Sequence, residues 1–183
     1  MAKQKVIVQI YDDWEESYNK VSRLLQALQS CCSRTICEIS VVPYYDGHLM
    51  VRDCSIFDKV FWSFQACVET FKHSKLFVSV DGTHLYSKYG GVLLIAVAQD
   101  GNSNILPVAF AITESETMES WSSFLTNLRQ HVTPQEGLLI ISDRSLAIKA
   151  TLRVDDSGWC NTPVRLSLTS RCKAKINQGL RQF

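Results

Sequence analysis

The sequence of 183 residues is 46% hydrophobic and 20% charged, and it is long enough for one globular domain with a buried core. This composition excludes a disordered chain and a bare coiled coil. The formal net charge of +1 does not by itself indicate a nucleic-acid partner, which usually shows as a basic surplus.

The charge is unevenly spread along the chain. Residues 153–183 hold six basic and two acidic residues, a net of +4, whereas residues 1–152 hold 13 basic and 16 acidic residues, a net of −3. An acidic core beside a basic tail suits a metal site next to a segment that contacts phosphate. A solvated polar tail explains the same distribution.

The cysteines show no metal-binding or disulfide pattern, because no Cys-x-x-Cys spacing repeats and no histidine pair lies near them. We expect reduced, buried thiols of an intracellular protein. No segment approaches the roughly 18 apolar residues that a membrane span requires, so no membrane partner is expected.

The first 72 residues are predicted to be mainly helical. Apolar residues spaced three and four apart predict a helix over residues 14–30. Weak alternation and the turn signal Tyr45-Asp46-Gly47 indicate a short hairpin within residues 31–55. A wide apolar stripe predicts a second helix over residues 57–71.

From residue 76 the pattern changes to that of strands. Residues 76–81, 92–98 and 105–113 read as three strands, and the hairpin residues at 99–104 make the last two antiparallel neighbours. Pro107 cannot donate to a ladder, which predicts that the third strand lies at a sheet edge.

A helix capped by Thr117 and closed by Pro134 follows, and then a buried strand at residues 137–142. The strand–helix–strand succession predicts a parallel crossover that places the fourth strand beside the first. The expected fold class is α/β, with a mixed sheet of order 3-2-1-4 in which three antiparallel strands are followed by a parallel one, and with flanking helices. A further helix is expected over residues 145–152.

Two aspartates, Asp81 and Asp143, follow the strands that this order makes parallel neighbours. Adjacent strands lie about 4.8 Å apart, so the two carboxylates are expected to share one hard divalent cation such as Mg²⁺. A simpler interpretation stays open at this point: Asp81 before Gly82 is a turn former, and Asp143 before a helix is its N-cap.

The sequence motifs around these aspartates resemble those of a known family. The segments VDGTHLYSKYGG, LLIAVAQDGNSNILPVAFAITESE and ISDRSLAIKA, with Trp121 and Phe124-Leu125 between the last two, are similar to the catalytic core of Mutator-like element (MULE) transposases. The likeness covers roughly residues 14–152. It implies an RNase H-like fold and DNA cleavage and strand transfer, dependent on Mg²⁺ or Mn²⁺, by an Asp, Asp and Glu triad. On this resemblance Asp81 is the first acid and Asp143 the second.

His84 and Arg144 lie within the same sequence motifs. The resemblance implies that both contact nucleic acid, Arg144 at a phosphate and His84 at DNA or a metal-bound water. A hydrogen bond within its loop is the alternative for His84, and an ion pair with Asp143 or another neighbour is the alternative for Arg144. Three glutamates are weaker candidates for the missing third acid: Glu114, Glu116 and Glu119.

In the family the third acid lies far downstream, so we expect this chain to be the remnant of a transposase core and inactive alone. A domesticated regulator similar to the far-red-response transcription factors of plants is the alternative. The expected division is an N-terminal helical region (1–72), a partial RNase H-like core (73–152) and a divergent basic tail (153–183). The expected partner is DNA, with a homo-oligomer as a further expectation and without a small-molecule cofactor, and the resemblance implies a nuclear location.

Overall fold

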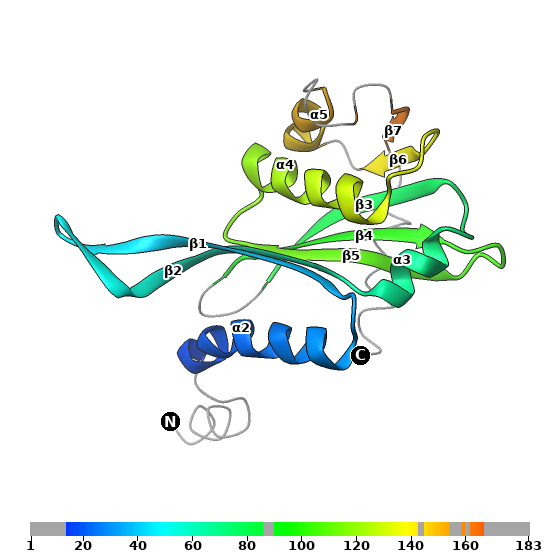
Figure 1. The fold of residues 1–183 in the computed structure, drawn as a ribbon. Helices are drawn as coiled ribbons and strands as arrows, with labels where there is room; N and C mark the ends of the chain where they lie inside the picture. Colours follow the sequence, from blue (N-terminus) through cyan, green and yellow to red (C-terminus); the bar gives the residue numbers. More distant parts are fainter. Residues whose placement is uncertain (1–13, 86–89, 143–144, 154–158, 160–161, 167–183) are drawn as a thin grey trace, which may run out of the picture.

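The computed structural model describes residues 14–85, 90–142, 145–153, 159 and 162–166. Figure 1 shows the elements arranged around one sheet. The helices are α2 (Trp14–Cys31), α3 (Gln65–Phe71), α4 (Met118–Asn127), the π-helix η1 (Leu128–Val132) and α5 (Leu146–Leu152). The strands are β1 (Ile36–Asp46), β2 (Leu49–Ser63), β3 (Phe77–His84), β4 (Val92–Gln99), β5 (Ile105–Thr113), β6 (Leu139–Ser142) and β7 (Val164–Leu166).

The fold is α/β, with a mixed seven-stranded sheet of order β1-β2-β5-β4-β3-β6-β7. The strands from β1 to β3 in this order pair antiparallel, and β3, β6 and β7 pair parallel. The predicted order of four strands is therefore wrong as a description of the sheet. The strands it named are consecutive neighbours (β5-β4-β3-β6), but β1 and β2 extend the sheet beyond β5, and β7 extends it beyond β6.

Strand β5 lies inside the sheet, so its predicted edge position is wrong. The structure tolerates Pro107 because β2 pairs only with the far end of β5, from Phe110 to Thr113. On the β4 side, Pro107 sits at a register shift, where Val108 is an extra residue between two paired positions. The missing N–H of the proline thus falls where the ladder is already interrupted.

The predicted helix over residues 57–71 is wrong for its first half, because β2 continues to Ser63 and only Gln65–Phe71 is helical. Val60 and Phe61 are both buried, at 2% and 3% exposed, although consecutive strand residues point to opposite faces. Both faces of the sheet are covered here, so apolar residues stand at adjacent positions and imitate a helical stripe. Within residues 14–72, which the structure describes, β1 and β2 stand between the helices α2 and α3. The division of the chain into three parts stays a prediction.

Helices cover the two faces of the sheet unequally. Helices α4 and α5 lie on one face, and α2 lies on the other (Figure 1). The main core fills the α4 face, where Trp121 and Phe124 pack in one cluster with Val78, Val80 and Phe61. The rings of Phe61 and Phe124 lie 5.9 Å apart between centroids. This layer holds β3 firmly in place from one side.

The N-terminus of α4 is capped as the sequence predicts. The Oγ1 atom of Thr117 accepts a hydrogen bond from the backbone N–H of Ser120 at 3.1 Å, and Glu119 lies in the first turn. We expect Thr117→Ala to lower the free energy of unfolding by about 1 kcal/mol, because one N–H at the helix start loses its partner. Urea denaturation followed by circular dichroism measures this loss, and Thr117→Ser, which keeps the acceptor, is the matched control. An unchanged midpoint for the alanine variant would contradict the capping role.

The N-terminal helix α2 agrees with the predicted helix over residues 14–30. Its apolar face points toward the sheet, and Leu25 is 6% exposed there. Among the helices of the described residues, none combines the length and apolar character needed to cross a membrane.

The described cysteines are free, but the prediction that they are buried is wrong for three of them. Cys31, Cys32 and Cys54 are exposed, whereas Cys37 and Cys67 are partly buried. Burial raises the pKa of both the Cys37 and the Cys67 thiol above the ordinary value, with the Glu38 carboxylate adding to the effect at Cys37. Cys160 and Cys172 lie outside the described residues.

Candidate functional site

Of the two aspartates predicted to bind the metal ion, Asp81 is the one whose position the structure describes. It lies in β3, which is flanked by β4 and β6, and only 9% of its surface is exposed. Its Oδ1 atom accepts a hydrogen bond from the backbone N–H of Gly82 at 3.0 Å. A carboxylate this deeply buried is unusual unless it is paired, hydrogen-bonded or coordinated to a cation.

Asp81 does not form a turn, so the simpler interpretation of this residue is wrong. Strand β3 continues through Gly82 to His84 and stays paired with β4, Asp81 opposite Ile95 and His84 opposite Val92. The sequence places Asp81 at the end of a strand, whereas the structure places it inside one. A carboxylate in the interior of a sheet needs a reason other than turn chemistry.

The parallel pairing of β3 with β6 brings the neighbourhoods of the two predicted acids together. In this register Phe77 lies opposite Leu139, and Val80 lies opposite Ser142. The paired residues Val80 and Ser142 each immediately precede a predicted acid in the chain, and both are 1% exposed. The pairing of the strands on which the prediction depends is confirmed.

Asp143 and Arg144 themselves lie outside the described residues. The helix that follows them, α5, begins at Leu146, and Ser145 occupies its N-cap position. Asp143 is therefore not the N-cap residue of α5, and that simpler interpretation of Asp143 is wrong as well.

The structure separates His84 from Asp81. Side chains of a strand alternate between the two faces, and β3 is regularly paired with β4 from Ser79 to His84. Asp81 therefore shares a face with Ser79 and with Ile95 of β4, whereas His84 shares the opposite face with Val80. His84 is exposed and belongs to a strand, so the alternative of a histidine held within a loop is also wrong.

The residue that sequence reasoning undervalued is Glu116. A Cβ atom added at Gly82 would lie 3.2 Å from the Glu116 Oε2 atom, so this carboxylate packs directly on the strand that carries Asp81. The Glu116 Oε1 atom accepts a hydrogen bond from the Trp121 indole Nε1 at 3.2 Å. Gly82 has no side chain and so leaves room for the Glu116 carboxylate. The sequence gives one sign of this contact: a glycine follows Asp81, and a glutamate lies five residues before Trp121.

Glu116 lies on the α4 face, since Gly82 alternates with Asp81 along β3. It is thus held beside the strand but on the face opposite the Asp81 side chain. The other two glutamates weighed as substitutes, Glu114 and Glu119, are exposed.

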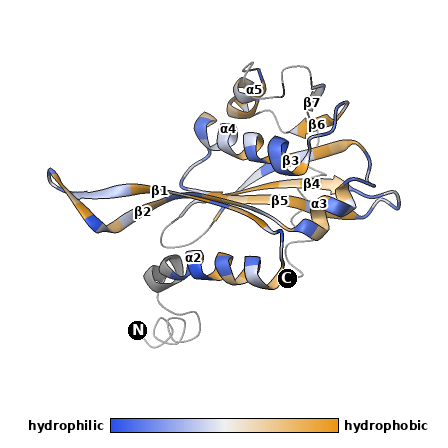
Figure 2. Cartoon of the chain, in the orientation of Figure 1, coloured by the Kyte–Doolittle hydropathy of each residue, from blue (hydrophilic) through white to orange (hydrophobic). Residues whose placement is uncertain are grey.

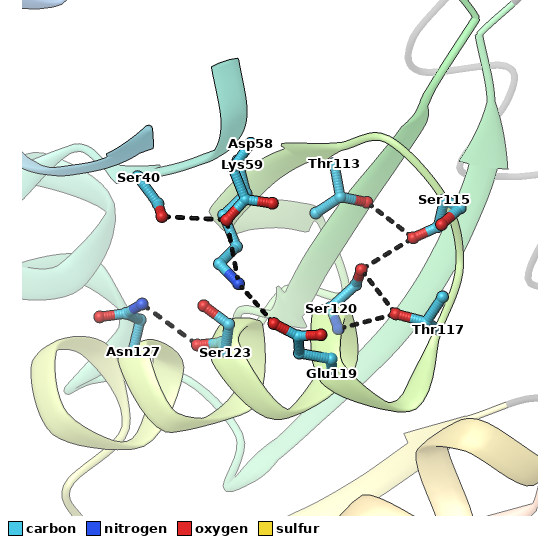
Figure 3. A network of polar contacts seen from close by, with 10 residues as sticks. All are labelled: Ser40, Asp58, Lys59, Thr113, Ser115, Thr117, Glu119, Ser120, Ser123 and Asn127. Atoms are coloured by element: carbon cyan, nitrogen blue, oxygen red, sulfur yellow. Dashed lines mark hydrogen bonds and ion pairs between the residues drawn. The ribbon is translucent and has the colours of Figure 1, made fainter. Parts of the chain in front are cut away.

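A second group of charged residues joins β2 to α4 (Figure 3). The Lys59 Nζ atom lies 3.3 Å from Asp58 Oδ2 and 3.5 Å from Glu119 Oε1. The same Asp58 oxygen accepts a hydrogen bond from Ser40 Oγ at 2.9 Å. Strands β5 and β4 stand between β2 and β3, a separation of about 14 Å at the usual strand spacing. This network fastens α4 to the sheet and is no part of the Asp81 site.

Within the described residues, no group of three or more His, Cys, Asp or Glu side chains is placed to hold a metal ion. The described part of the site offers one buried carboxylate, with the hard oxygen donors that Mg²⁺ and Mn²⁺ prefer.

Comparison with known proteins relates part of the chain to one family. The family model described as the MULE transposase domain matches residues 77–159, from the first residue of β3 through α5 to the buried Trp159. Among curated proteins, none matches the chain. The match takes in both predicted acids, their two strands and the crossover helix α4. Residues 77–159 of this chain are therefore a MULE-type transposase region.

Proposed function

We propose that the transposase region carries the first two metal-binding acids of a DNA-cleaving core, Asp81 and Asp143, and that this core has the RNase H-like fold. The observation that supports the proposal is the register of the parallel pair, Val80 opposite Ser142. Each acid follows its paired residue by one peptide unit, about 3.8 Å between Cα atoms, and paired strands lie about 4.8 Å apart. Two carboxylates at that spacing can serve one cation.

The donor chemistry fits a magnesium or manganese ion. Both residues supply carboxylate oxygens, and such ions take one or two protein carboxylates and keep water in their remaining positions. A cation bound there would stabilise negative charge that develops on the oxygens of a phosphodiester. Asp81 is only 9% exposed, and in such a weakly hydrated position the attraction of a carboxylate to a cation is stronger than in water.

The remaining predicted residues take different roles. Arg144, next to Asp143 in the chain, is proposed to bind a DNA phosphate, because a guanidinium pairs with phosphate through two parallel hydrogen bonds. His84 lies on the other face of β3, so we propose it as a DNA contact and not as a ligand of the ion. The resemblance to MULE transposases is the basis on which we propose a nuclear location.

Calorimetric titration with Mn²⁺ tests the metal site. The Asp81→Asn, Asp143→Asn variant is expected to bind Mn²⁺ at least about tenfold more weakly than the wild type, because both charged oxygen donors are lost. The matched control is Glu38→Gln, Glu136→Gln, which removes the same two charges from exposed positions and is expected to bind as the wild type does. Circular dichroism of each variant verifies the fold. Equal binding by all three proteins would remove the site assignment.

Electrophoretic mobility shift with duplex DNA tests the substrate class. Binding that weakens steeply with salt, together with nicking in Mn²⁺, supports a DNA-cleaving core. Salt-sensitive binding without nicking would favour a DNA-binding regulator derived from a transposase, and no binding would contradict both.

A further inference from the structure

The hairpin of β1 and β2 extends well beyond the rest of the sheet (Figure 1). Strand β2 pairs with β5 only through Lys59–Trp62, so among the described strands the outer part of the hairpin has no third neighbour. We call residues 41–56 the arm. A two-stranded hairpin alone is only marginally stable in water, so the arm gains from a further surface that packs on it.

The face of the hairpin on the side of α2 is apolar and exposed. Ile39 and Val41 line a cleft together with residues of α2, so both lie on this face. Pro43 and Tyr45 follow on the same face by the alternation of β1, and Met50 joins them because it is paired with Tyr45. Val41, Tyr45 and Met50 are 53%, 56% and 51% exposed. Figure 2 shows hydrophobic residues along both strands of the arm.

Two clefts follow this face and join. The inner cleft, of about 440 Å³, lies between α2 and the base of the hairpin, and the outer cleft, of about 460 Å³, lies on the arm. Val41 and Ser55 line both clefts, which therefore form one groove. From Ile39 to the level of Tyr45 the groove follows six residue steps of β1, about 20 Å at the rise of a strand. An extended segment of about six residues has this length.

An apolar segment of that length precedes α2 in the sequence. Residues 6–11 are VIVQIY, and only Asp12 and Asp13 separate them from Trp14, the first residue of α2. They lie outside the described residues. Four of the six are β-branched, a composition that favours an extended conformation. One set of alternate positions is wholly β-branched and would form a single apolar face: Val6, Val8 and Ile10.

The direction of α2 brings this segment to the arm. Figure 1 shows the first turn of α2 on the side of the hairpin tip. Trp14 is seven residues before Val21, which lines the inner cleft with Val41. Seven helical residues span about 10 Å, the length of about three strand residues, so α2 begins about level with Tyr44. Two residues then connect α2 to residues 6–11, which therefore start beside the groove.

Charge favours the same placement. Arg52 is exposed and lines the outer cleft at the level of Tyr44, because the preceding Val51 is paired with Tyr44. Asp12 and Asp13, next to the start of α2, bring the opposite charge to this level of the arm. An exposed ion pair contributes little energy, but complementary charges help to fix the register of two surfaces.

The size of the apolar face suits a tethered segment better than a separate molecule. A buried tyrosine contributes about 200 Å² and an aliphatic side chain roughly 100 Å². About half of each of the four side chains Ile39, Val41, Tyr45 and Met50 is exposed, or on the order of 250 Å² in total. With the partner's side counted this is ~500 Å², whereas specific interfaces between separate molecules begin near ~1,000 Å².

A tether removes most of the entropy cost that a separate molecule pays on binding. A segment joined by so short a linker is present at an effective concentration in the millimolar range, so a small contact is sufficient. We propose that residues 6–11 lie extended in the groove and cover the α2 face of the arm, with Val6, Val8 and Ile10 against the hairpin. This inference is independent of the proposed metal site and of DNA cleavage.

Thiol modification tests the placement on the full chain, because Cys54 is exposed and lines the outer cleft. Its rate of reaction with a bulky maleimide is measured by mass spectrometry and compared with that of Cys31, which is exposed at the far end of α2. Cys54 is expected to react at least about tenfold more slowly in the wild type than in the Val6→Ser, Val8→Ser, Ile10→Ser variant, which loses the apolar face. Cys31 is expected to react equally in both.

The matched control is Lys3→Ser, Gln4→Ser, Gln9→Ser, which introduces three serines into the same stretch and keeps the apolar face. Protection of Cys54 in the wild type and the control, lost in the apolar variant and unchanged on dilution, supports the proposal. Equal rates in all three proteins overturn it. Protection that disappears on dilution assigns the groove to a second copy and overturns it as well. Circular dichroism verifies the fold of each variant.

Single cysteine substitutions provide a second measurement that does not depend on the folding of the triple variant. Val6→Cys, Val8→Cys and Ile10→Cys are each oxidised mildly at high dilution, and the disulfides are identified by peptide mapping. At least one of the three is expected to form a bridge to Cys54, which requires the two Cα atoms to approach within about 7 Å. Bridges to Cys31 or Cys32 alone, or no bridge in any variant, overturn the proposal.

Discussion

Replacing Trp121 with alanine is expected to lower the free energy of unfolding by about 3–5 kcal/mol. The side chain is fully buried and packs edge-on against Phe124, with 5.8 Å between ring centroids and 78° between the rings. The substitution leaves a cavity between α4 and the sheet and removes the indole donor from Glu116. For a domain of this size the melting temperature falls by roughly 10 °C or more.

Urea denaturation measured by circular dichroism provides the free energies. Trp121→Phe keeps most of the apolar volume and loses the hydrogen bond, so its expected cost is smaller, about 1–2 kcal/mol. Met118→Ala, at a side chain 47% exposed in the same helix, is expected to cost less than about 1 kcal/mol. If Trp121→Ala cost no more than Met118→Ala, the packing of α4 on β3 would be wrong.

The second large effect is expected at Trp159, beyond the last turn of α5. This side chain is 1% exposed, and its Nε1 atom donates a hydrogen bond to the Leu125 carbonyl at 3.1 Å. The guanidinium carbon of Arg129 lies 5.1 Å from the centre of the indole ring. Trp159→Ala is expected to lower the free energy of unfolding by about 3–5 kcal/mol, since cavity formation adds to the loss of a cation–π contact.

Trp159→Phe is the matched variant for this position, because it keeps an aromatic face under Arg129 and removes only the indole donor. Its expected cost is about 1–2 kcal/mol. Thermal unfolding followed by intrinsic fluorescence and by circular dichroism distinguishes the two variants. A neutral Trp159→Ala would contradict the place of the Trp159 side chain in the core.

The sequence predicts best those elements whose hydrophobic period fits only one structure. The strand from Val92 is apolar throughout and bounded by Gly91 and the turn at Asp100, and no helix fits so short a segment. Residues 57–63 fit two periods at once, and only the pairing of β2 with β1 and β5 decides in favour of a strand. Such a non-local contact overrides local propensity, and the sequence alone gives no sign of it.

The same distinction applies to the candidate site. The parallel pairing that places Val80 opposite Ser142 follows from the chain order of strand, helix and strand, and it was predictable. The opposite faces of Asp81 and His84 follow from the length of β3, which the sequence understates by three residues because Gly82 looks like a strand terminator. The contact of Glu116 with Gly82 depends on the three-dimensional packing of α4, and no sequence pattern predicts it reliably.

The parallel alignment of β3 with β6 also affects the order in which the protein folds. The hairpins β1–β2 and β4–β5 join residues that are near in the chain, whereas β3 and β6 join partners about 60 residues apart, across the whole crossover through α4. Closing that long loop costs chain entropy before any contact repays it. We therefore expect both hairpins to gain protection from hydrogen exchange early in refolding and the β3–β6 pair to gain it last, so that the surroundings of Asp81 are completed only in the final step.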